Sequence, residues 1–452
     1  MDSLPETRYL RASDGAYIAY QAFGEGPVDI VFGFNSDESN VDLMWDEPDW
    51  RPFMTGAAEF GRLILHDRRG LGVSSRNVSP PNLETQVGDL LAVLDAAESE
   101  RPILAGATGG GAMHALFAAT HPDRTDGLLW NNPAGRTAWA PDYPWGLGPE
   151  EFERSIQESV IWGTTSYGSS IAQWRAAERV GVPLADLEGA SEAPERLNTY
   201  AKINRNTATP DVAREILRID WETDVRAILP SVHARTALVT GTRDNIEEVE
   251  YIASLMPNAV VHVLEGRSGI AAEPILQILR EMGGIQPPPA GLDTVLSTIL
   301  FTDIVGSTQR QAALGDRAWK ALIETHHGLV RAALVRWRGV ENDTAGDGFY
   351  ATFDGPARAI RCALEITERI RELGVEIRAG VHTGDCELID GKCGGISVTT
   401  GARISALAAP SQVLVSQTVK DLVAGSGLRF TEVGDHELRG IPGRWRLYSV
   451  LN

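Results

Sequence analysis

Two short acidic stretches constrain the C-terminal part of this 452-residue chain more than any other feature. An apolar run, residues 295–301, leads into Asp303 and then into a Gly-Ser-Thr break, which is typical of a buried strand that passes into a helix. Downstream, Gly346-Asp347-Gly348 separates two short β-like runs, which predicts a hairpin with an acid at its tip. If the two strands are neighbours in one sheet, both carboxylates point to one place. Such a pair of oxygen ligands suits Mg²⁺ or Mn²⁺, and paired metals beside a nucleotide serve phosphoryl chemistry.

Length and charge limit the classes of protein to which the chain can belong. A length of 452 residues predicts two to four domains, each with its own core. The net charge of −20 argues against a nucleic-acid partner or an anionic membrane, because both require a basic face. We find no signal sequence and no apolar run near the ~20 residues of a membrane span. Three cysteines without metal-ligand spacing indicate reduced thiols, so we expect a soluble, cytoplasmic protein.

From about Thr294 to the C-terminus, the chain resembles the catalytic domain of class III nucleotidyl cyclases. Besides the two acidic stretches, the matching motifs are Ile377-Arg378-Ala379-Gly380-Val381-His382-Thr383-Gly384, Gly401-Ala402-Arg403 and His436-Glu437-Leu438-Arg439-Gly440. Five motifs in the family's order make the resemblance strong. It implies a ferredoxin-like βαββαβ domain, and the predicted order of strands and helices after residue 293 agrees with that topology. The predicted elements include one helix over residues 309–337 and two strands over residues 375–381 and 386–389.

The resemblance also implies a reaction and a set of residues. A ribose 3′-hydroxyl attacks the α-phosphate of the same nucleotide and expels pyrophosphate, as in a phosphorus–oxygen lyase. Asp303, Asp347 and the Ile304 carbonyl match the ligands of two divalent cations per active site, Mg²⁺ or Mn²⁺. Arg403 matches the arginine that stabilises the transition state, and Arg439 stands where the family usually has a phosphate-binding lysine.

Three positions depart from the family pattern. Asp343 stands at a lysine position, Ile396 at the position we assign to a base-reading aspartate, and Thr399 at an asparagine position four residues before Arg403. Lysine and aspartate together read adenine, whereas guanylyl cyclases place a glutamate where Asp343 lies. We therefore expect ATP as substrate on family frequency, with GTP open. Loss of base hydrogen bonds relaxes selectivity and raises KM more than it stops turnover.

The resemblance further implies a homodimer. In this family the metal-binding acids and the arginine equivalent to Arg403 come from different subunits and meet at a two-fold interface. One chain carries both sets here, so we expect two equivalent composite sites.

The N-terminal part alternates strands with helices, which predicts a mostly parallel sheet covered on both faces. Over about residues 6–283 it resembles the α/β-hydrolase family. The matching stretches are Asp67-Arg68-Arg69-Gly70-Leu71-Gly72-Val73-Ser74 and Gly106-Ala107-Thr108-Gly109-Gly110, the latter where the nucleophile elbow belongs.

The hydrolase motifs are degenerate at two of three catalytic positions. Thr108 replaces the nucleophilic serine, and its extra methyl group crowds a strained turn. Asp244 matches the acid, but Gly269 lies at or near the place of the histidine. His262 lies within a predicted strand, where a packed or hydrogen-bonded histidine is the more common case. Without an imidazole base, neither Thr108 nor a water is activated in the usual way.

We expect an α/β plus α+β chain with two domains. Residues 1–283 form the hydrolase-like domain with a cap over about 133–226, residues 284–292 a proline-rich linker, and residues 293–452 the cyclase domain. The cap's aromatic residues are either its own core or a pocket for a small molecule.

Three functions fit these observations. The first is a nucleotidyl cyclase regulated by a non-hydrolytic domain. The second is a receptor or scaffold in which both domains bind ligands without turnover. The third is an esterase with a degenerate cyclase domain, which the loop at Gly269 disfavours.

Overall fold

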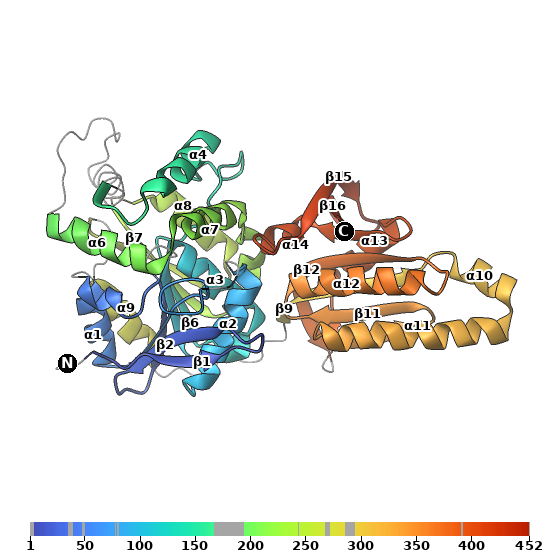
Figure 1. The fold of residues 1–452 in the computed structure, drawn as a ribbon, viewed down its shortest axis with the longest axis horizontal. Helices are drawn as coiled ribbons and strands as arrows, with labels where there is room; N and C mark the ends of the chain where they lie inside the picture. The colour runs from blue at the N-terminus through green and yellow to red at the C-terminus, as the bar shows by residue number, and fades with distance from the viewer. Residues whose placement is uncertain are drawn as a thin grey trace. The chain divides into compact units, whose positions relative to one another are not determined.

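The computed structural model describes residues 4–34, 39–47, 50–76, 78, 81–166, 194–242, 244–266, 272–284, 294–389 and 392–451. The chain divides into two compact units, Met1–Ala290 and Gly291–Asn452, each with its own sheet (Figure 1). Most of the predicted linker, and Gly269 of the hydrolase motif, lie outside the described residues. Within the described ranges, every helix is too short or too polar to cross a lipid bilayer.

A single sheet organises the first unit. Its described strands are β1 (Arg8–Arg11), β2 (Tyr17–Phe23), β3 (Asp29–Gly33), β4 (Arg62–His66), β5 (Ile103–Ala107), β6 (Gly127–Asn131), β7 (Arg235–Gly241) and β8 (Ala259–Leu264). Their order in the sheet is β1-β2-β4-β3-β5-β6-β7-β8. Strand β2 pairs antiparallel with both of its neighbours, β1 and β4. All other neighbouring strands in this order pair parallel. The predicted mostly parallel sheet is therefore confirmed.

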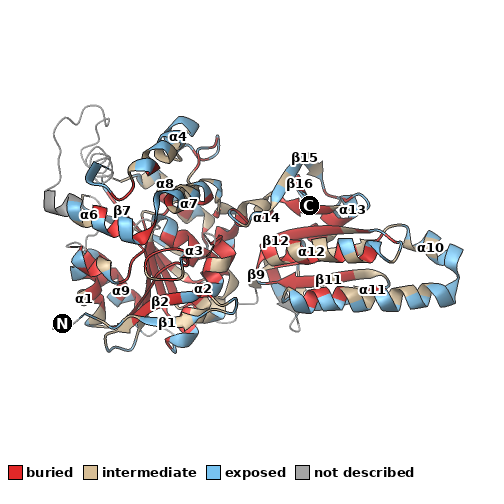
Figure 2. Cartoon of the chain, in the orientation of Figure 1, coloured by how far each residue is buried: buried red, intermediate tan, exposed pale blue. Residues whose placement is uncertain are grey.

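Helices cover both faces of this sheet. The main ones are α1 (Trp50–Ala58), α2 (Leu83–Ala96), α3 (Thr108–Thr120), α8 (Ile246–Leu255) and α9 (Ala272–Met282), with the short 3-10 turns η1 (Leu43–Asp46) and η2 (Pro122–Arg124). Side chains of α1 and α9 share a buried cluster with alternate residues of β3, β4 and β5. Strand residues that alternate with these point to the opposite face, where α2 and α3 lie. Figure 2 shows the strands as the buried centre of the unit.

The insertion between β6 and β7 carries the predicted cap. Its described elements are α4 (Pro149–Glu158), η3 (Ser159–Ile161), α6 (Pro194–Thr207), α7 (Pro210–Glu222) and the turn η5 (Arg226–Ser231) that leads to β7. Of the cap's aromatic residues, Tyr143, Trp162 and Tyr200 are buried. Burial of these rings favours a role in the cap's own core.

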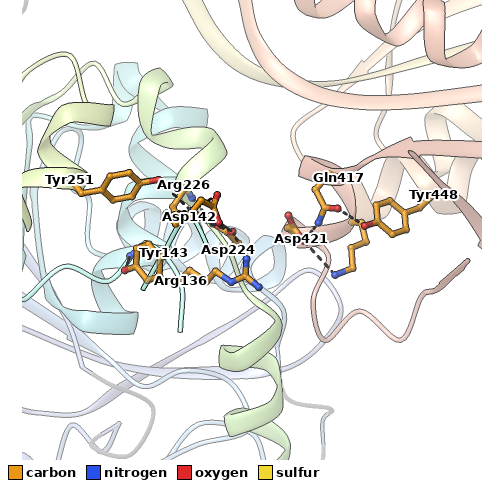
Figure 3. Close-up of polar contacts among 11 residues, drawn as sticks. Arg136, Asp142, Tyr143, Asp224, Arg226, Tyr251, Gln417, Asp421 and Tyr448 are labelled. Carbon is orange, nitrogen blue, oxygen red and sulfur yellow. Dashed lines mark hydrogen bonds and ion pairs between the residues drawn. The ribbon is translucent and has the colours of Figure 1, made fainter. Parts of the chain in front are cut away.

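The two ends of the cap are tied together by Arg226 (Figure 3). Its guanidinium bonds Asp224 at 2.8 Å and Asp142 at 3.1 Å, and lies 5.0 Å from the centre of the Tyr143 ring. The Tyr143 hydroxyl donates to Glu248 of α8 and accepts from the Gly135 backbone N–H. The cap is therefore anchored to the sheet domain by charge and hydrogen bonds at its stem.

The second unit is built on an antiparallel sheet with one parallel pair. Its strands are β9 (Thr294–Ile304), β10 (Val340–Ala345), β11 (Gly348–Phe353), β12 (Ile377–Ile389), β13 (Lys392–Gly394), β14 (Val413–Ser416), β15 (Arg429–Glu437) and β16 (Arg444–Leu451). The order is β10-β11-β9-β12-β14-β16-β15, with β13 paired to β12. The four strands β12-β9-β11-β10 have the order of a βαββαβ unit.

Two sets of helices pack on this sheet. They are α10 (Ser307–Leu314), α11 (Asp316–Arg336), α12 (Pro356–Arg371), α13 (Ile396–Leu407) and α14 (Gln417–Leu422). Buried residues of α11, α12 and α14 share one cluster with Leu300 and Ile304 of β9. Residues of α13 belong to another cluster, with Leu414 and Leu447. Because side chains alternate along a strand, Asp303 points to the face that α13 covers. Near β16, Gln417 of α14 accepts from the Tyr448 hydroxyl (Figure 3).

The structure corrects two predicted elements of this unit. The single helix expected over residues 309–337 is two, α10 and α11, because Gly315 adopts a φ of 78° that breaks the helix. The two strands expected over residues 375–381 and 386–389 are one strand, β12. Gly384-Asp385 reads as a turn in the sequence, but continuous pairing with β9, from Ile377↔Ile304 to Glu387↔Thr294, keeps the chain extended there.

Close packing of α3 against β6 gives a stability prediction. A Cβ atom added at Gly111 would lie 2.0 Å from Cδ1 of the buried Trp130 ring, whereas one at Gly109 would meet nothing within 4 Å. We expect Gly111→Ala to lower the free energy of unfolding of the first unit by about 1–3 kcal/mol through overpacking. Gly109→Ala, the matched control, should be neutral or slightly stabilising, because alanine favours a helix by up to ~1 kcal/mol. Urea unfolding followed by tryptophan fluorescence measures both. Equal effects would contradict the packing argument.

Candidate active site

The fold of the second unit brings the two predicted aspartates together. Asp303 is the penultimate residue of β9, and Asp347 lies in the tight turn between β10 and β11. Because Phe349 pairs with Thr302, the hairpin turn folds back beside the end of β9. A Cβ atom added at Gly348 would lie 3.9 Å from Asp303 Oδ1, which shows how near that carboxylate comes to the turn. Both aspartates are half-buried.

The carboxylate of Asp347 is held by donors from the start of the β9–α10 connection. The backbone N–H of Ile304 donates to its Oδ2 at 2.9 Å, and Ser307 adds a side-chain hydrogen bond. Gly306, with a φ of 67°, makes the sharp turn between these two donors possible. Burial raises the pKa of Asp347, and the negative charge of Asp303 raises it further against these hydrogen bonds. Asp347 therefore lies where a cation would be favoured.

Arg378 also belongs to this site, although the sequence analysis assigned it no role. It is the Cα partner of Asp303 across the β9–β12 ladder, and its Nη2 and Nε donate to Asp303 Oδ2 at 2.7 and 3.1 Å. Its Nη1 also donates to the Ala406 carbonyl at 3.2 Å. The sequence motif at 377–384 contains this arginine, but only the strand register shows which carboxylate it faces.

The donor set fits a hard divalent cation. Two carboxylates, from Asp303 and Asp347, and the backbone at Ile304 offer oxygen ligands at one place, which are the ligands that Mg²⁺ and Mn²⁺ prefer. Magnesium sites beside phosphates commonly use one or two carboxylates and complete the shell with water and substrate oxygens. In the described part of the chain no cluster of three or more His, Cys, Asp or Glu side chains is placed for a metal, so this carboxylate pair is the candidate.

A second, cationic cluster lies on α13. The exposed Arg403 donates from Nε to the Arg439 carbonyl at 3.1 Å, which brings the two predicted arginines together. Thr399, one helical turn earlier, is also exposed, and its hydroxyl donates to the Gly395 carbonyl at 3.5 Å. Thr399 and Arg403 share a helix face because they are four residues apart. Among the described residues, no hydrogen bond or ion pair joins this cluster to Asp303 or Asp347.

Glycines let α13 lie close to the sheet. A Cβ atom at Gly380 of β12 would lie 2.2 Å from the Ser405 backbone nitrogen, and one at Gly401 would lie 2.9 Å from the Ile299 side chain. Any larger residue at either position would push the helix away. The position of Arg403 on the outer face of α13 therefore depends on these two close contacts.

The two positions predicted to read the base differ in chemistry, since one is a carboxylate and the other is apolar. Asp343 is exposed on β10 opposite Tyr350, and its Oδ1 accepts from the Thr344 backbone N–H at 3.0 Å. Ile396 is the first residue of α13 and is 60% exposed. Tyr350 stacks on Phe301, with ring centroids 4.9 Å apart and an interplanar angle of 8°. This aromatic pair, beside Asp343, is a feature of the face that sequence reasoning missed.

The turn predicted as a nucleophile elbow lies between β5 and α3. Thr108 is the first residue of α3, is exposed, and has a φ of 38°, an unusual value for a β-branched residue. Its carbonyl accepts from Trp130 Nε1 at 2.8 Å. Gly106 and Gly110 are tightly enclosed, since added Cβ atoms would meet Gly111 N at 2.9 Å and Gly33 O at 2.6 Å. The turn at Thr108 is therefore both strained and closely packed.

The other predicted hydrolase position among the described residues is the acid, Asp244. Asp244 lies after β7, where its Oδ2 accepts from the Gly241 backbone N–H at 2.8 Å. His262 is half-buried within β8, as the sequence suggested, with its backbone paired to Val239. Burial lowers the pKa of His66 to about 4 and that of His114 to about 3, so both are neutral core residues near pH 7.

Comparison with known proteins identifies the second unit. Residues 292–452 match the family model of the adenylate and guanylate cyclase catalytic domain. The C-terminal unit belongs to this family. An uncharacterised protein of Mycobacterium tuberculosis is 32% identical over 160 residues, which cover 34% of this chain and 54% of that protein. A receptor-type adenylate cyclase of Trypanosoma brucei brucei is 26% identical over 204 residues, covering 34% of this chain and 16% of that protein. The chain thus spans about half the length of the first curated relatives it matches.

The first unit has the α/β-hydrolase fold. A bromoperoxidase from Bacillus anthracis superimposes with a TM-score of 0.50 and 19% identity, covering 61% of this chain and 99% of that protein. At this identity the likeness concerns the fold alone. The predicted architecture, a hydrolase-like α/β domain followed by a cyclase domain, is confirmed.

The ion pair on Asp303 gives a prediction for cation binding. Arg378 competes with any cation for that carboxylate, so Arg378→Gln should tighten Mn²⁺ binding in the absence of nucleotide. Because both side chains are about a third exposed, 35% and 37%, we expect only a modest gain. An exposed ion pair contributes up to ~1 kcal/mol, or about fivefold in affinity. Titration calorimetry with Mn²⁺ measures it. Arg331→Gln, which removes an ion pair with Glu341 elsewhere on the hairpin, is the matched control. Weaker binding by the Arg378 variant would exclude this competition.

Proposed function

We propose that this chain is a nucleotidyl cyclase that converts ATP into a 3′,5′-cyclic nucleotide and pyrophosphate. Its base pocket also leaves GTP open as a substrate. The observation that carries the proposal is the meeting of Asp303 and Asp347 at one end of a sheet that matches the cyclase family model. In this proposal residues 293–452 form the catalytic domain, and residues 1–283 form a regulatory domain joined through residues 284–292.

Each residue of the carboxylate cluster has a role in the proposed reaction. Asp303, Asp347 and the Ile304 carbonyl hold two Mg²⁺ or Mn²⁺ ions. When bound, these ions lower the pKa of the ribose hydroxyl and neutralise the triphosphate. If Asp303 held a cation, Arg378 would be released from its ion pair with Asp303 and could donate to phosphate oxygens. The N–H of Ile304 keeps Asp347 oriented throughout.

The cationic cluster completes the site from a second subunit. Arg403 stabilises the negative charge that develops on the α-phosphate, Arg439 binds a phosphate, and Thr399 orients the ribose through its hydroxyl. The absence of a bond between this cluster and the aspartates, among the described residues, supports a composite site. A two-fold homodimer supplies both clusters to each of two sites.

The base pocket departs from the usual readers of adenine. Asp343 presents a carboxylate that accepts hydrogen bonds, which guanine can supply from N1–H and its amino group. Ile396 offers only an apolar contact. The proposal is therefore a cyclase with relaxed base selectivity, in which ATP is favoured only on family frequency.

The first unit is proposed to regulate the cyclase without hydrolysing esters. Its elbow turn is preserved, but a threonine stands at the nucleophile position with a φ of 38°. Fold alone does not give function, and the scaffold without its nucleophile is suited to binding a small molecule under the cap.

Mixing two inactive variants tests the cyclase and its composite site together. Asp303→Ala and Arg403→Ala should each lower cyclic nucleotide production from ATP and GTP, with Mn²⁺, by ~100-fold or more, since each removes transition-state charge stabilisation. In an equal mixture, half of randomly formed dimers carry one intact site, so activity should return to about a quarter of wild type. Glu368→Ala, an exposed acid on α12, is the control that should remain fully active. Inactive wild-type protein would refute the cyclase. Active wild type without recovery in confirmed mixed dimers would refute the composite site.

Ester hydrolysis tests the assignment of the first unit. We expect no cleavage of short-chain nitrophenyl esters by the purified chain beyond that of Thr108→Ala, because Thr108 lies on a strained turn and lacks an imidazole partner in the sequence motif. Hydrolysis by the wild-type chain that disappears in Thr108→Ala would show a working esterase instead.

A further inference from the structure

Two of the three cysteines of the chain lie together on the face that carries the candidate active site. Cys386 is in β12 and Cys393 in β13, two antiparallel neighbours in which Leu388 pairs with Cys393 and Glu387 with Gly394. Cys386 and Cys393 are therefore diagonal neighbours on one side of the sheet. Cys386 and Arg378 are an even number of residues apart in β12, so both side chains point to the face covered by α13.

The contacts of the two sulfur atoms place them side by side. Cys386 Sγ lies 3.5 Å from the Gly384 carbonyl oxygen, and Cys393 Sγ lies 3.6 Å from Ser297 Oγ. Gly384 and Ser297 are themselves Cα partners across the β9–β12 ladder. The two thiols are close enough for each to shift the pKa of the other.

The two thiols differ in the way that a reactive dithiol requires. Cys393 is partly exposed, whereas Cys386 is buried. The contact with Cys386 lowers the pKa of Cys393, while the same contact and burial raise the pKa of Cys386. An accessible thiolate attacks disulfides readily, and a buried neighbour serves as the resolving thiol.

We propose that Cys386 and Cys393 form a reversible disulfide that controls the cyclase face of this chain. The oxidant is a low-molecular-weight disulfide, RSSR. The Cys393 thiolate attacks one of its sulfur atoms and releases RS⁻, which leaves a mixed disulfide on Cys393. The sulfur of Cys386, after losing its proton, attacks Cys393 Sγ and expels the second RS⁻. Two protein thiols and one RSSR thus become one protein disulfide and two RSH.

Bond formation requires a movement of β13. Diagonal strand neighbours are about 7–8 Å apart, whereas a disulfide holds its Cα atoms at about 4.4–6.8 Å. The bond therefore draws β13 along or toward β12, against contacts that hold it in the reduced state.

Those contacts link β13 to both halves of the proposed site. The Cys393 carbonyl accepts from the Tyr350 hydroxyl at 2.8 Å, and its N–H donates to Asn342 Oδ1 at 3.4 Å. Asn342 lies at the bulge of β10 next to Asp343. On the other side, β13 leads through Gly395 directly into α13, which carries Thr399 and Arg403. Oxidation should therefore disturb the base pocket and the arginine helix together.

Thiol mapping tests the bond itself. The reduced full-length protein is equilibrated with glutathione disulfide and glutathione at several ratios, and intact mass and non-reducing peptide maps are recorded. We expect the oxidised protein to be lighter by two hydrogen atoms and to yield a peptide in which Cys386 is linked to Cys393. Dithiothreitol should reverse both changes. Cys362, buried in α12 with its pKa raised to about 12, is the internal control and should stay reduced. A mixed disulfide on Cys393 that never resolves, or no reaction at all, would overturn the proposal.

Variants test the control of activity. Oxidation should lower cyclic nucleotide production several-fold in wild type and in Cys362→Ser, and dithiothreitol should restore it. Cys393→Ser should be insensitive, and Cys386→Ala and Cys386→Ser provide two substitutions at the buried position, each checked by circular dichroism. An oxidised protein with unchanged activity would refute the control while leaving the proposed cyclase intact. Because the mass measurement needs no turnover, an inactive chain that forms the bond would refute the cyclase and the control of its activity, and leave the bond.

Discussion

Two carboxylates of like charge, on Asp303 and Asp347, are held close together, and the second unit is built around this constraint. Left alone, such a pair repels and one member takes up a proton. The chain offsets the repulsion with the Ile304 N–H and Ser307 on Asp347, and with Arg378 on Asp303. These donors come from the end of β9, the start of α10 and the facing strand β12. The strand pairings that form the sheet therefore also make the site.

The same sheet separates two kinds of charge. The acids lie where β9 meets the β10–β11 turn, and Arg403 with Arg439 lies on the outer side of α13. Gly380 and Gly401 fix how closely that helix approaches the sheet, so packing places Arg403, and in the described ranges no ion pair joins it to the acids. Strand β13 lies between these regions, joined to the hairpin by hydrogen bonds and to α13 by the chain itself. A movement of this short strand thus affects both.

The first unit contains a strained, closely packed turn at the start of α3. The elbow retains its enclosed glycines and a residue of positive φ, a conformation that costs about 1–3 kcal/mol and persists only where the surroundings enforce it. Here the buried Trp130 ring packs against Gly111, and its Nε1 donates a hydrogen bond to the Thr108 carbonyl. These contacts hold Thr108 in its strained conformation.

The sequence by itself determined the class of each unit, because hydrophobic periodicity and turn residues are local signals. It also singled out Asp303, Asp347, Arg403 and Arg439 through their motifs. Only the tertiary structure decided that Arg378 faces Asp303, that Tyr350 stacks on Phe301, and that the two cysteines are neighbours. Each of these depends on the register between strands distant in sequence. Register follows from the packing of the whole sheet, which no local pattern encodes.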